Sequence, residues 1–448
     1  MEARTLCSYC QERHSSHPHA KRAASAADCF ICHGLMDHIP RLASEALGKS
    51  AGKEWNSFLV QTTFGREVLL REEAVFDEEP LEGAMAIKNQ CNRLAIDYLV
   101  QASGKPFHPQ GDLSFVLDFT RMAGKANPAN LFIFGHYLKK TRTYCQHDWA
   151  CSACRGRGCR VCNFHKQNYP SIEGALRGVF APAFGASDAH LHASGREDVD
   201  VMHLEGGRPF VLELVHPAKR AADLPSLAAQ VATLHPLEVL GLKYCSLSWV
   251  EMVCNSHFDK HYRAWVVPGL PESGPAHAPA VPTEPGPAHT PAASRNASAA
   301  SRAAPVASQN APSASGLPAQ RVLPGAEKTA SASSSPSHEF SPEDLDKLLS
   351  SVPVFINQQT PVRVMGRRSD LVRARRVYEI KPVSISKDEW VLDIFAEAGT
   401  YIKEFVHSDQ GRTVPSVSGI LGFPCRCKQL DVMGVEDLYL STLKARNE

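Results

Sequence analysis

The stretch HASGREDVDVMHLEGGRPFVLELVHP, residues 192–217, places charged side chains directly before a strand-like pattern. Asp198 and Asp200 follow Arg196, and the apolar run over 209–215 predicts the second strand of a hairpin that turns at 205–207. Carboxylates beside arginines at the start of a strand are compatible with ordinary ion pairs, which stabilise little. They are equally compatible with a nucleophile kept ionised by nearby cations. These residues alone leave both interpretations open.

Helices and strands alternate along the rest of the chain. Apolar residues recur at helical spacing over 80–100 and 224–234, and GTYIKEFVH (399–407) leads into a further helix. Strands are expected within 112–120, 130–142 and 390–394. This mixture predicts the α+β class, with α/β as the alternative. The sequence has no phosphate-loop or dinucleotide-binding glycine pattern, which argues against a nucleotide cofactor.

Size and charge restrict the class of protein. The chain has 448 residues, of which 43% are hydrophobic, enough for two or three packed domains. Its formal net charge of +1 means that a polyanionic partner must be held by local basic patches. Apolar runs are too short for a membrane span, and the N-terminus lacks the apolar core of a secretory signal. A soluble intracellular protein is therefore expected.

Eight of the 14 cysteines form four CxxC pairs. Free or disulfide-bonded thiols are one interpretation. Two CxxC pairs can also close a tetrahedral zinc shell, which a reducing cell favours over disulfides. Each set would leave no open coordination position, so structural zinc is expected. The two predicted sets are Cys7, Cys10, Cys29 and Cys32, and Cys151, Cys154, Cys159 and Cys162.

The composition changes abruptly at residues 268–337. This segment is dominated by Pro, Ala, Ser and Gly, and no aromatic residue occurs between Trp265 and Phe340. Such a segment buries too little apolar surface to offset its chain entropy and is predicted to be disordered. It is either a linker between domains or an insertion within one.

Four blocks of the sequence resemble one known family. SGREDVDV with GRPFVLELVHP closely resembles the catalytic signature of the pseudouridine synthase 10 family of tRNA modification enzymes. Three further blocks resemble family blocks in the same order: FDKHYRA (258–264), INQQTPVRVMGRRSDLVRARRV (356–377) and EAGTYIKEFVHSDQGRTVPS (397–416). The sequence departs from the family pattern at His136 and at QHDW (146–149), which concerns accessory RNA contacts more than the chemistry.

The resemblance implies a fold and a division of the chain. It implies a mixed, largely antiparallel sheet flanked by helices, with a zinc-bearing, THUMP-like accessory domain at the N-terminus. The accessory RNA-binding domain is expected over 1–145 and the catalytic domain over 146–267 and 338–448. The segment 268–337 then becomes an insertion in a surface loop, which costs little closure entropy and favours a eukaryotic source, hence the nucleus or cytoplasm.

The resemblance also implies an activity. The enzyme would be an isomerase that converts a uridine of the tRNA T-arm, at position 55 with 54 as a further candidate, into pseudouridine, without an organic cofactor. Asp198 would be the catalytic aspartate, with Asp200 the less favoured alternative. Tyr262 would stack on the uracil, and Lys403 would pair with Asp198.

The remaining expectations concern RNA binding and assembly. A monomer is expected, and tRNA is the expected partner. The alternative function is a zinc-dependent RNA-binding protein without catalysis; a methyltransferase is disfavoured by the missing glycine-rich loop. The arginines of RVMGRR and RARR are candidates for phosphate contacts, as are Arg196, Arg208, Lys260, Arg263 and Arg412.

Overall fold

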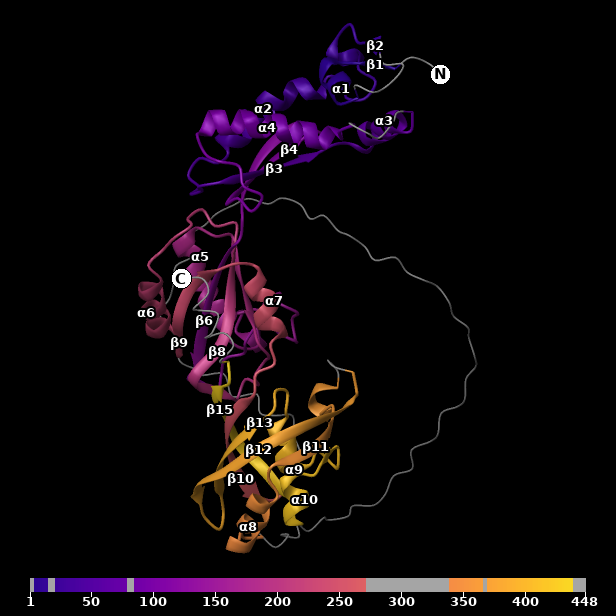
Figure 1. Ribbon diagram of the computed structural model, residues 1–448. Helices are drawn as coiled ribbons and strands as arrows, with labels where there is room; N and C mark the ends of the chain where they lie inside the picture. Colours follow the sequence, from indigo (N-terminus) through magenta and orange to yellow (C-terminus); the bar gives the residue numbers. More distant parts are fainter. Residues whose placement is uncertain (1–3, 15–20, 79–83, 271–337, 366–368, 438–448) are drawn as a thin grey trace, which may run out of the picture. The chain divides into compact units, whose positions relative to one another are not determined.

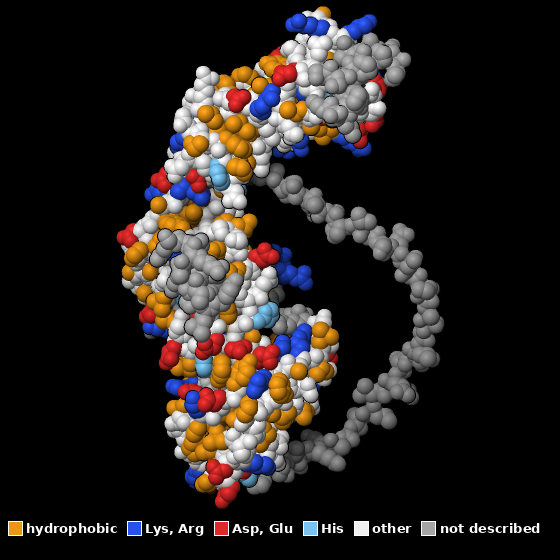
Figure 2. Space-filling model, in the orientation of Figure 1, with side chains coloured by type: hydrophobic (Ala, Val, Ile, Leu, Met, Phe, Trp, Pro, Cys, Tyr) orange, Lys and Arg blue, Asp and Glu red, His pale blue; other side chains and the backbone are white. Residues whose placement is uncertain are grey.

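The computed structural model of the chain describes residues 4–14, 21–78, 84–270, 338–365 and 369–437. Among these residues no helix is both long and apolar enough to span a membrane. Basic, acidic and apolar side chains are interspersed over the face drawn in Figure 2.

The N-terminal elements enclose a three-stranded sheet of their own. Strand β3 pairs in parallel with β4, and β4 pairs antiparallel with β5. Leu42 of α2 and Cys91 and Leu99 of α4 are fully buried in the core formed with this sheet. The elements are β1 (Thr5–Leu6), α1 (Ser8–Arg13), β2 (Lys21–Arg22), α2 (Ile39–Gly48), β3 (Phe58–Thr63), α3 (Arg66–Phe76), α4 (Ile87–Ser103), β4 (Leu113–Asp118) and β5 (Ala123–Pro128).

A ten-stranded mixed sheet carries the rest of the described chain. Its order is β14-β11-β12-β13-β10-β15-β8-β6-β9, and β7 pairs with β8 beside this path. The described strand pairings are antiparallel except for β15 with β8. The sheet is therefore mixed and largely antiparallel, as expected from the resemblance. The strands are β6 (Leu131–Lys139), β7 (Asp188–Ala193), β8 (Met202–Val215), β9 (Leu237–Cys245), β10 (Lys260–Pro268), β11 (Val354–Gln359), β12 (Val372–Ile385), β13 (Trp390–Ala396), β14 (Thr413–Val414) and β15 (Cys425–Val435).

Helices cover both faces of the β6–β8–β9 part of the sheet (Figure 1). Phe210, Leu212 and Leu214 of β8 pack with α5 (Ile172–Phe184) and α6 (Leu224–Leu234). Val211 points the other way and packs with α7 (Ser248–Asn255). Burial on both faces explains why residues 209–215 of β8 are almost continuously apolar rather than alternating.

The other part of the sheet has its own core. Buried side chains of β10–β13 and β15 pack with α8 (Pro342–Ser350), α9 (Ile402–His407) and α10 (Val417–Leu421). Strand β10 precedes residues 271–337 and β13 and β15 follow them, yet β10 lies hydrogen-bonded between these two strands. The predicted disordered insertion itself falls almost wholly outside the described residues.

The prediction of a hairpin that turns at 205–207 is wrong. Residues 202–215 form one strand, β8, and its hairpin partner is β7. Gly206 and Gly207 have φ of 69° and 74°, and the pairing of β6 with β8 shifts register here, so that Tyr137 faces Arg208 while Lys139 faces His203. Two glycines with positive φ therefore make a bulge inside the strand rather than a turn.

The other predicted elements differ mainly at their ends. The strands expected within 112–120, 130–142 and 390–394 are β4, β6 and β13, and the helices expected over 224–234 and after 399 are α6 and α9. The helix predicted from 80 begins at Ile87, and Pro80 lies outside the described residues. Strand β6 starts at Leu131 and belongs to the ten-stranded sheet, so this sheet starts ahead of the boundary predicted at 145.

Candidate active site

Asp198 lies on the loop between β7 and β8, at a cavity of about 580 Å³. This cavity brings together residues that are far apart in the sequence. Six residues that the sequence named individually as candidates line it: Arg196, Asp198, Arg208, Lys260, Tyr262 and Lys403. Its described lining holds seven Lys and Arg side chains but two carboxylates, those of Glu197 and Asp198. A cavity with this excess of cations is suited to a polyanionic ligand.

Two cations hold the Asp198 carboxylate. One guanidinium nitrogen of Arg363 donates to both carboxylate oxygens, at 2.9 and 2.8 Å. The Lys403 ammonium lies 3.5 Å from Asp198 Oδ2 and closer, at 2.8 Å, to Asp200. Lys403 therefore pairs mainly with Asp200, and Arg363 is the principal partner of Asp198. Arg363 lies in the arginine run singled out from the sequence, but this role had not been assigned to it.

These cations determine the protonation state of Asp198. Burial by itself would raise the pKa of its carboxyl group, but Arg363 and Lys403 outweigh this effect and lower the pKa below its ordinary value. Burial likewise acts to lower the pKa of Lys403, while Asp200 and Asp198 raise it above its ordinary value. Asp198 is thus an anion and Lys403 a cation at neutral pH.

Tyr262 lies on β10 and contributes to the floor of the cavity. Its side chain packs in the core formed by β10–β13 and β15 with α8–α10. Burial raises the pKa of its hydroxyl to about 12, so the phenol is neutral at physiological pH. A buried neutral phenol combines an apolar ring face with one polar group.

Arg208 and Glu197 form a buried ion pair behind the loop. The Arg208 Nε lies 2.8 Å from Glu197, and both side chains are almost fully buried. The Tyr137 hydroxyl donates to the same carboxylate at 2.9 Å. The positive charge of Arg208 is balanced by Glu197, and its side chain is buried. Arg208 therefore supports the loop as well as lining the cavity.

Two of the arginines named individually as candidates, Arg263 and Arg412, do not line the cavity. Arg263 makes a two-pronged ion pair with Asp393, at 2.7 and 2.8 Å, between β10 and β13. Arg412 pairs with Asp370 at 2.6 Å and donates to the Thr360 carbonyl. Arg373 and Arg375 of β12 line the cavity instead. Their alternate spacing on one strand, which puts both side chains on one face, was the sequence signal for this.

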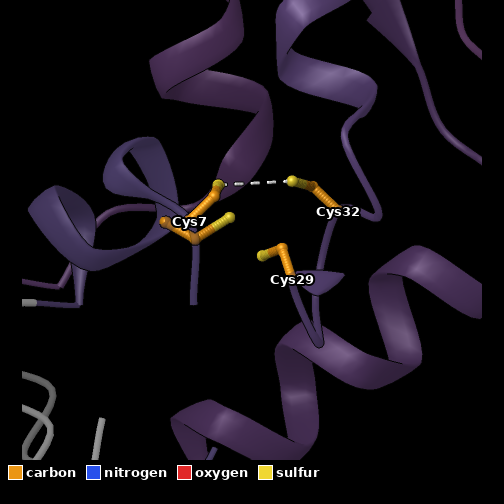
Figure 3. Close-up of side chains that lie close together, drawn as sticks. Cys7, Cys29 and Cys32 are labelled. Carbon is orange, nitrogen blue, oxygen red and sulfur yellow. Dashed lines mark hydrogen bonds between the residues drawn. The ribbon is translucent and has the colours of Figure 1, made fainter. Parts of the chain in front are cut away.

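Both predicted cysteine sets come together. In each set the four sulfur atoms lie within 4.8 Å of one another. Figure 3 shows the sulfurs of Cys7, Cys29 and Cys32 turned toward one another from two separate segments. Tetrahedral zinc, about 2.3 Å from each thiolate, needs sulfurs about 3.8 Å apart. The Cys7 and Cys32 sulfurs are 3.5 Å apart, and those of Cys154 and Cys162 are 3.9 Å apart. Both sets can therefore hold a metal ion.

The link inside the second set turns through glycines. Gly156 and Gly158 have φ of 79° and 95°, a conformation that favours glycine. The predicted tight turn between the two CxxC pairs is thus present. The set belongs to the segment that leaves β6 at Lys139 and returns to the core at Ile172, where α5 begins.

Comparison with known proteins gives the family. The family model described as Pus10, C-terminal, matches residues 132–271 and 321–436. The chain belongs to this family. A relative from Archaeoglobus fulgidus, named tRNA pseudouridine synthase Pus10, is 29% identical over 412 residues, 92% of this chain and 95% of the relative. A relative of the same name from Methanopyrus kandleri is 28% identical over 417 residues, 90% of this chain and 80% of the relative.

A third relative of this name shares a shorter region. The protein from Methanocaldococcus jannaschii is 32% identical over 311 residues, 68% of this chain and 53% of that protein. Among solved structures, a Cbf5-Nop10-Gar1 complex matches with a TM-score of 0.26 and 12% identity, over 67% of this chain and 48% of the matched chain. A TM-score this low supports no argument about this member of the Pus10 family.

Proposed function

We propose that the chain is a tRNA pseudouridine synthase, an isomerase that converts a T-arm uridine, at position 55 or 54, into pseudouridine. The observation that carries the proposal is the Asp198 carboxylate, paired with Arg363 and Lys403 in a cation-lined cavity that also contains Tyr262. Membership of the Pus10 family and relatives named tRNA pseudouridine synthase support it.

The reaction explains why this arrangement is suitable. The bond between uracil N1 and C1′ breaks, the base turns, and C5 bonds to C1′. C5 loses a proton and N1 gains one, so atoms and electrons balance without a cofactor. Asp198 starts the reaction as a nucleophile or as a proton acceptor, and both roles require the carboxylate. The cations that lower the pKa of Asp198 keep it in that form.

The other residues bind and orient the substrate. The Tyr262 ring offers an apolar surface for the uracil, and its hydroxyl can assist the proton transfer at C5. Arg196, Lys260, Arg373 and Arg375 line the cavity where phosphates of a flipped-out nucleotide would lie. Arg263 and Arg412 are already held by carboxylates, so their contribution to RNA binding is secondary.

Zinc and the N-terminal elements complete the proposal. Both cysteine sets would hold Zn²⁺ as a structural ion that fixes local folding. The N-terminal elements through β5 would form a THUMP-like accessory domain that binds the tRNA, and the enzyme would act as a monomer.

The test measures tritium released from C5-labelled uridine in a tRNA transcript, with no cofactor added. The wild-type chain should release tritium, and Asp198→Asn should abolish release while tRNA affinity stays within about twofold. Asp200→Asn is the matched control and should keep measurable activity. Transcripts with cytidine at position 54 or 55 identify the target. Tight tRNA binding without release by the wild-type chain would instead favour the RNA-binding alternative.

A further inference from the structure

The backbone of the Asp198 loop is held by side-chain donors. Between Ser194 and Asp200, five carbonyl oxygens accept hydrogen bonds from four side chains. Gln146 donates to Gly195 at 3.0 Å, and Arg142 donates to Asp200 at 2.7 Å. Arg208 donates to Ser194, and Lys139 donates to Asp198 at 3.1 Å and to Val199 at 2.9 Å.

Lys139 is the central donor of this set. It lies at the end of β6, and its side chain is fully buried. A lysine ammonium has three donors, and the third goes to the Tyr144 carbonyl at 2.8 Å. All three are therefore used on backbone oxygens. Lys139 does not line the cavity, so contact with substrate does not account for it.

A buried ammonium has a large desolvation cost, which must be offset by its surroundings. Burial lowers the pKa of Lys139 below its ordinary value, although the charges of Glu197 and Asp200 oppose this shift. A neutral side chain of similar length would fill the same space without that cost, but it would leave the Tyr144 and Val199 carbonyls without this donor. The Asp198 carbonyl would keep only the Val201 N–H, at 3.2 Å. The buried side-chain nitrogen of Lys139 therefore serves to hold the backbone of the loop in place.

We infer that Lys139 is a positioning residue that fixes the backbone at Asp198 and Val199 and thereby aims the Asp198 carboxylate. It ties the loop to β6 and, through Tyr144, to residues 140–150, the stem that leads from β6 to the second cysteine set. Gln146, which is buried in that stem, fixes the same loop at Gly195. The inference rests on the proposed function of Asp198.

The test replaces Lys139 by methionine, which keeps length and removes the donors. Misplacement of a catalytic group by about 1 Å can slow chemistry about 100-fold. For Lys139→Met, single-turnover pseudouridine formation should fall by about 10- to 100-fold, while the Kd for tRNA stays within about twofold. Because the variant also loses stability, the control is Leu176→Ala in α5, which removes buried apolar contacts away from the loop. At matched loss of Tm, this control should keep the wild-type rate.

If Lys139→Met fails to fold, Gln146→Leu gives the same test at Gly195. Its single-turnover rate should fall while its Kd for tRNA stays within about twofold. The inference is overturned if the tested variant reacts at the wild-type rate, or if its rate loss equals that of the stability-matched control. A wild-type chain that releases no tritium would refute the proposed function instead, so the two failures are distinguishable.

Discussion

Arg363 is shared by two carboxylates in different surroundings. Its Nε lies 2.7 Å from Glu404, which is 2% exposed, whereas the Asp198 side chain is 42% exposed. Glu404 thus fixes the guanidinium from the buried side and leaves one nitrogen free to face Asp198. The more exposed carboxylate is the one that a substrate can reach.

Removing Arg363 should shift the pH profile. The charge of Arg363 is the largest single influence that lowers the pKa of Asp198, so Arg363→Met should raise that pKa. In the proposed mechanism the carboxylate is the active form, so the rate should fall as pH drops through its pKa. The acid limb of kcat should therefore move to higher pH, measured by tritium release from about pH 3 to about pH 7, a range that begins below the ordinary carboxyl pKa of about 3.9.

Lys403→Met is the comparison for that shift. The Lys403 ammonium is 3.5 Å from Asp198, whereas Arg363 is at 2.8 Å, so the acid limb should move in the same direction by a smaller amount. A larger shift for Lys403→Met, or an unchanged limb for Arg363→Met, would contradict the assignment of Arg363 as the principal partner.

Sequence blocks indicated the residues of the site better than their pairings. Asp198, Tyr262 and Lys403 do meet at one cavity. The cation nearest to Asp198 is set by how closely the loop after β11, with Arg363, and helix α9, with Lys403, lie to the Asp198 loop. No local sequence pattern encodes such distances. Arg263 and Arg412 look like RNA ligands in sequence, but their acidic partners lie on neighbouring strands or loops and become visible only in three dimensions.

At the scale of elements, the bulge inside β8 lies against β6. Gly207 packs against β6: a Cβ there would lie 2.9 Å from the His136 Cβ and 3.2 Å from the Tyr137 carbonyl oxygen. Gly206 has a similar φ, but a Cβ there would meet nothing within 4 Å. A substitution at Gly206 thus tests backbone strain alone, whereas one at Gly207 tests strain together with steric clash.

Gly206→Ala should lower the free energy of unfolding by about 1 kcal/mol, because of its left-handed backbone alone. Gly207→Ala should cost about 3 kcal/mol, because close backbone contact adds to the strain. Denaturant unfolding monitored by tryptophan fluorescence measures both. Equal losses would show that the bulge relaxes away from β6 and that the close approach is unimportant.

The cysteine sets give a second prediction at this scale. Elemental analysis should find two zinc ions per chain, one for each of the two sets. Cys29→Ser and Cys154→Ser should each reduce this to one, because a missing thiolate opens the tetrahedral shell. Cys254→Ser, at an exposed free cysteine outside both sets, should leave two. Retention of both ions by Cys29→Ser would exclude the first set as a four-cysteine site.

For the whole molecule, the sequence predicted the mixed class, the largely antiparallel sheet and most elements, because these follow from local periodicity and from family blocks. It did not predict that EGG continues a strand, since a bulge and a turn share the same glycines. The start of the sheet at β6 was also missed, because strand partnership depends on contacts more than 60 residues apart, such as Phe134 with Val211.

The last prediction concerns the two halves of the large sheet. Strand β10 is paired over its length with β13 and β15, which follow residues 271–337 in the chain. Asp198 and Tyr262 precede that segment, and Arg363 and Lys403 follow it, yet all four line one cavity. A polypeptide link is therefore not what holds the site together. The sheet and its buried side chains do so.

Cleavage within 272–337 should accordingly leave the two fragments associated and active. The nicked chain should elute as one species in gel filtration without denaturant and release tritium at near the wild-type rate. Replacing 272–337 by a flexible Gly/Ser link should likewise leave Tm and kcat unchanged, since loop length contributes to closure entropy only logarithmically. Normal Tm with a lower kcat/KM on tRNA would assign this segment a role in RNA binding. Fragments that separate spontaneously would contradict the shared sheet, because the β10 pairings with β13 and β15 would then be too weak to complete the site.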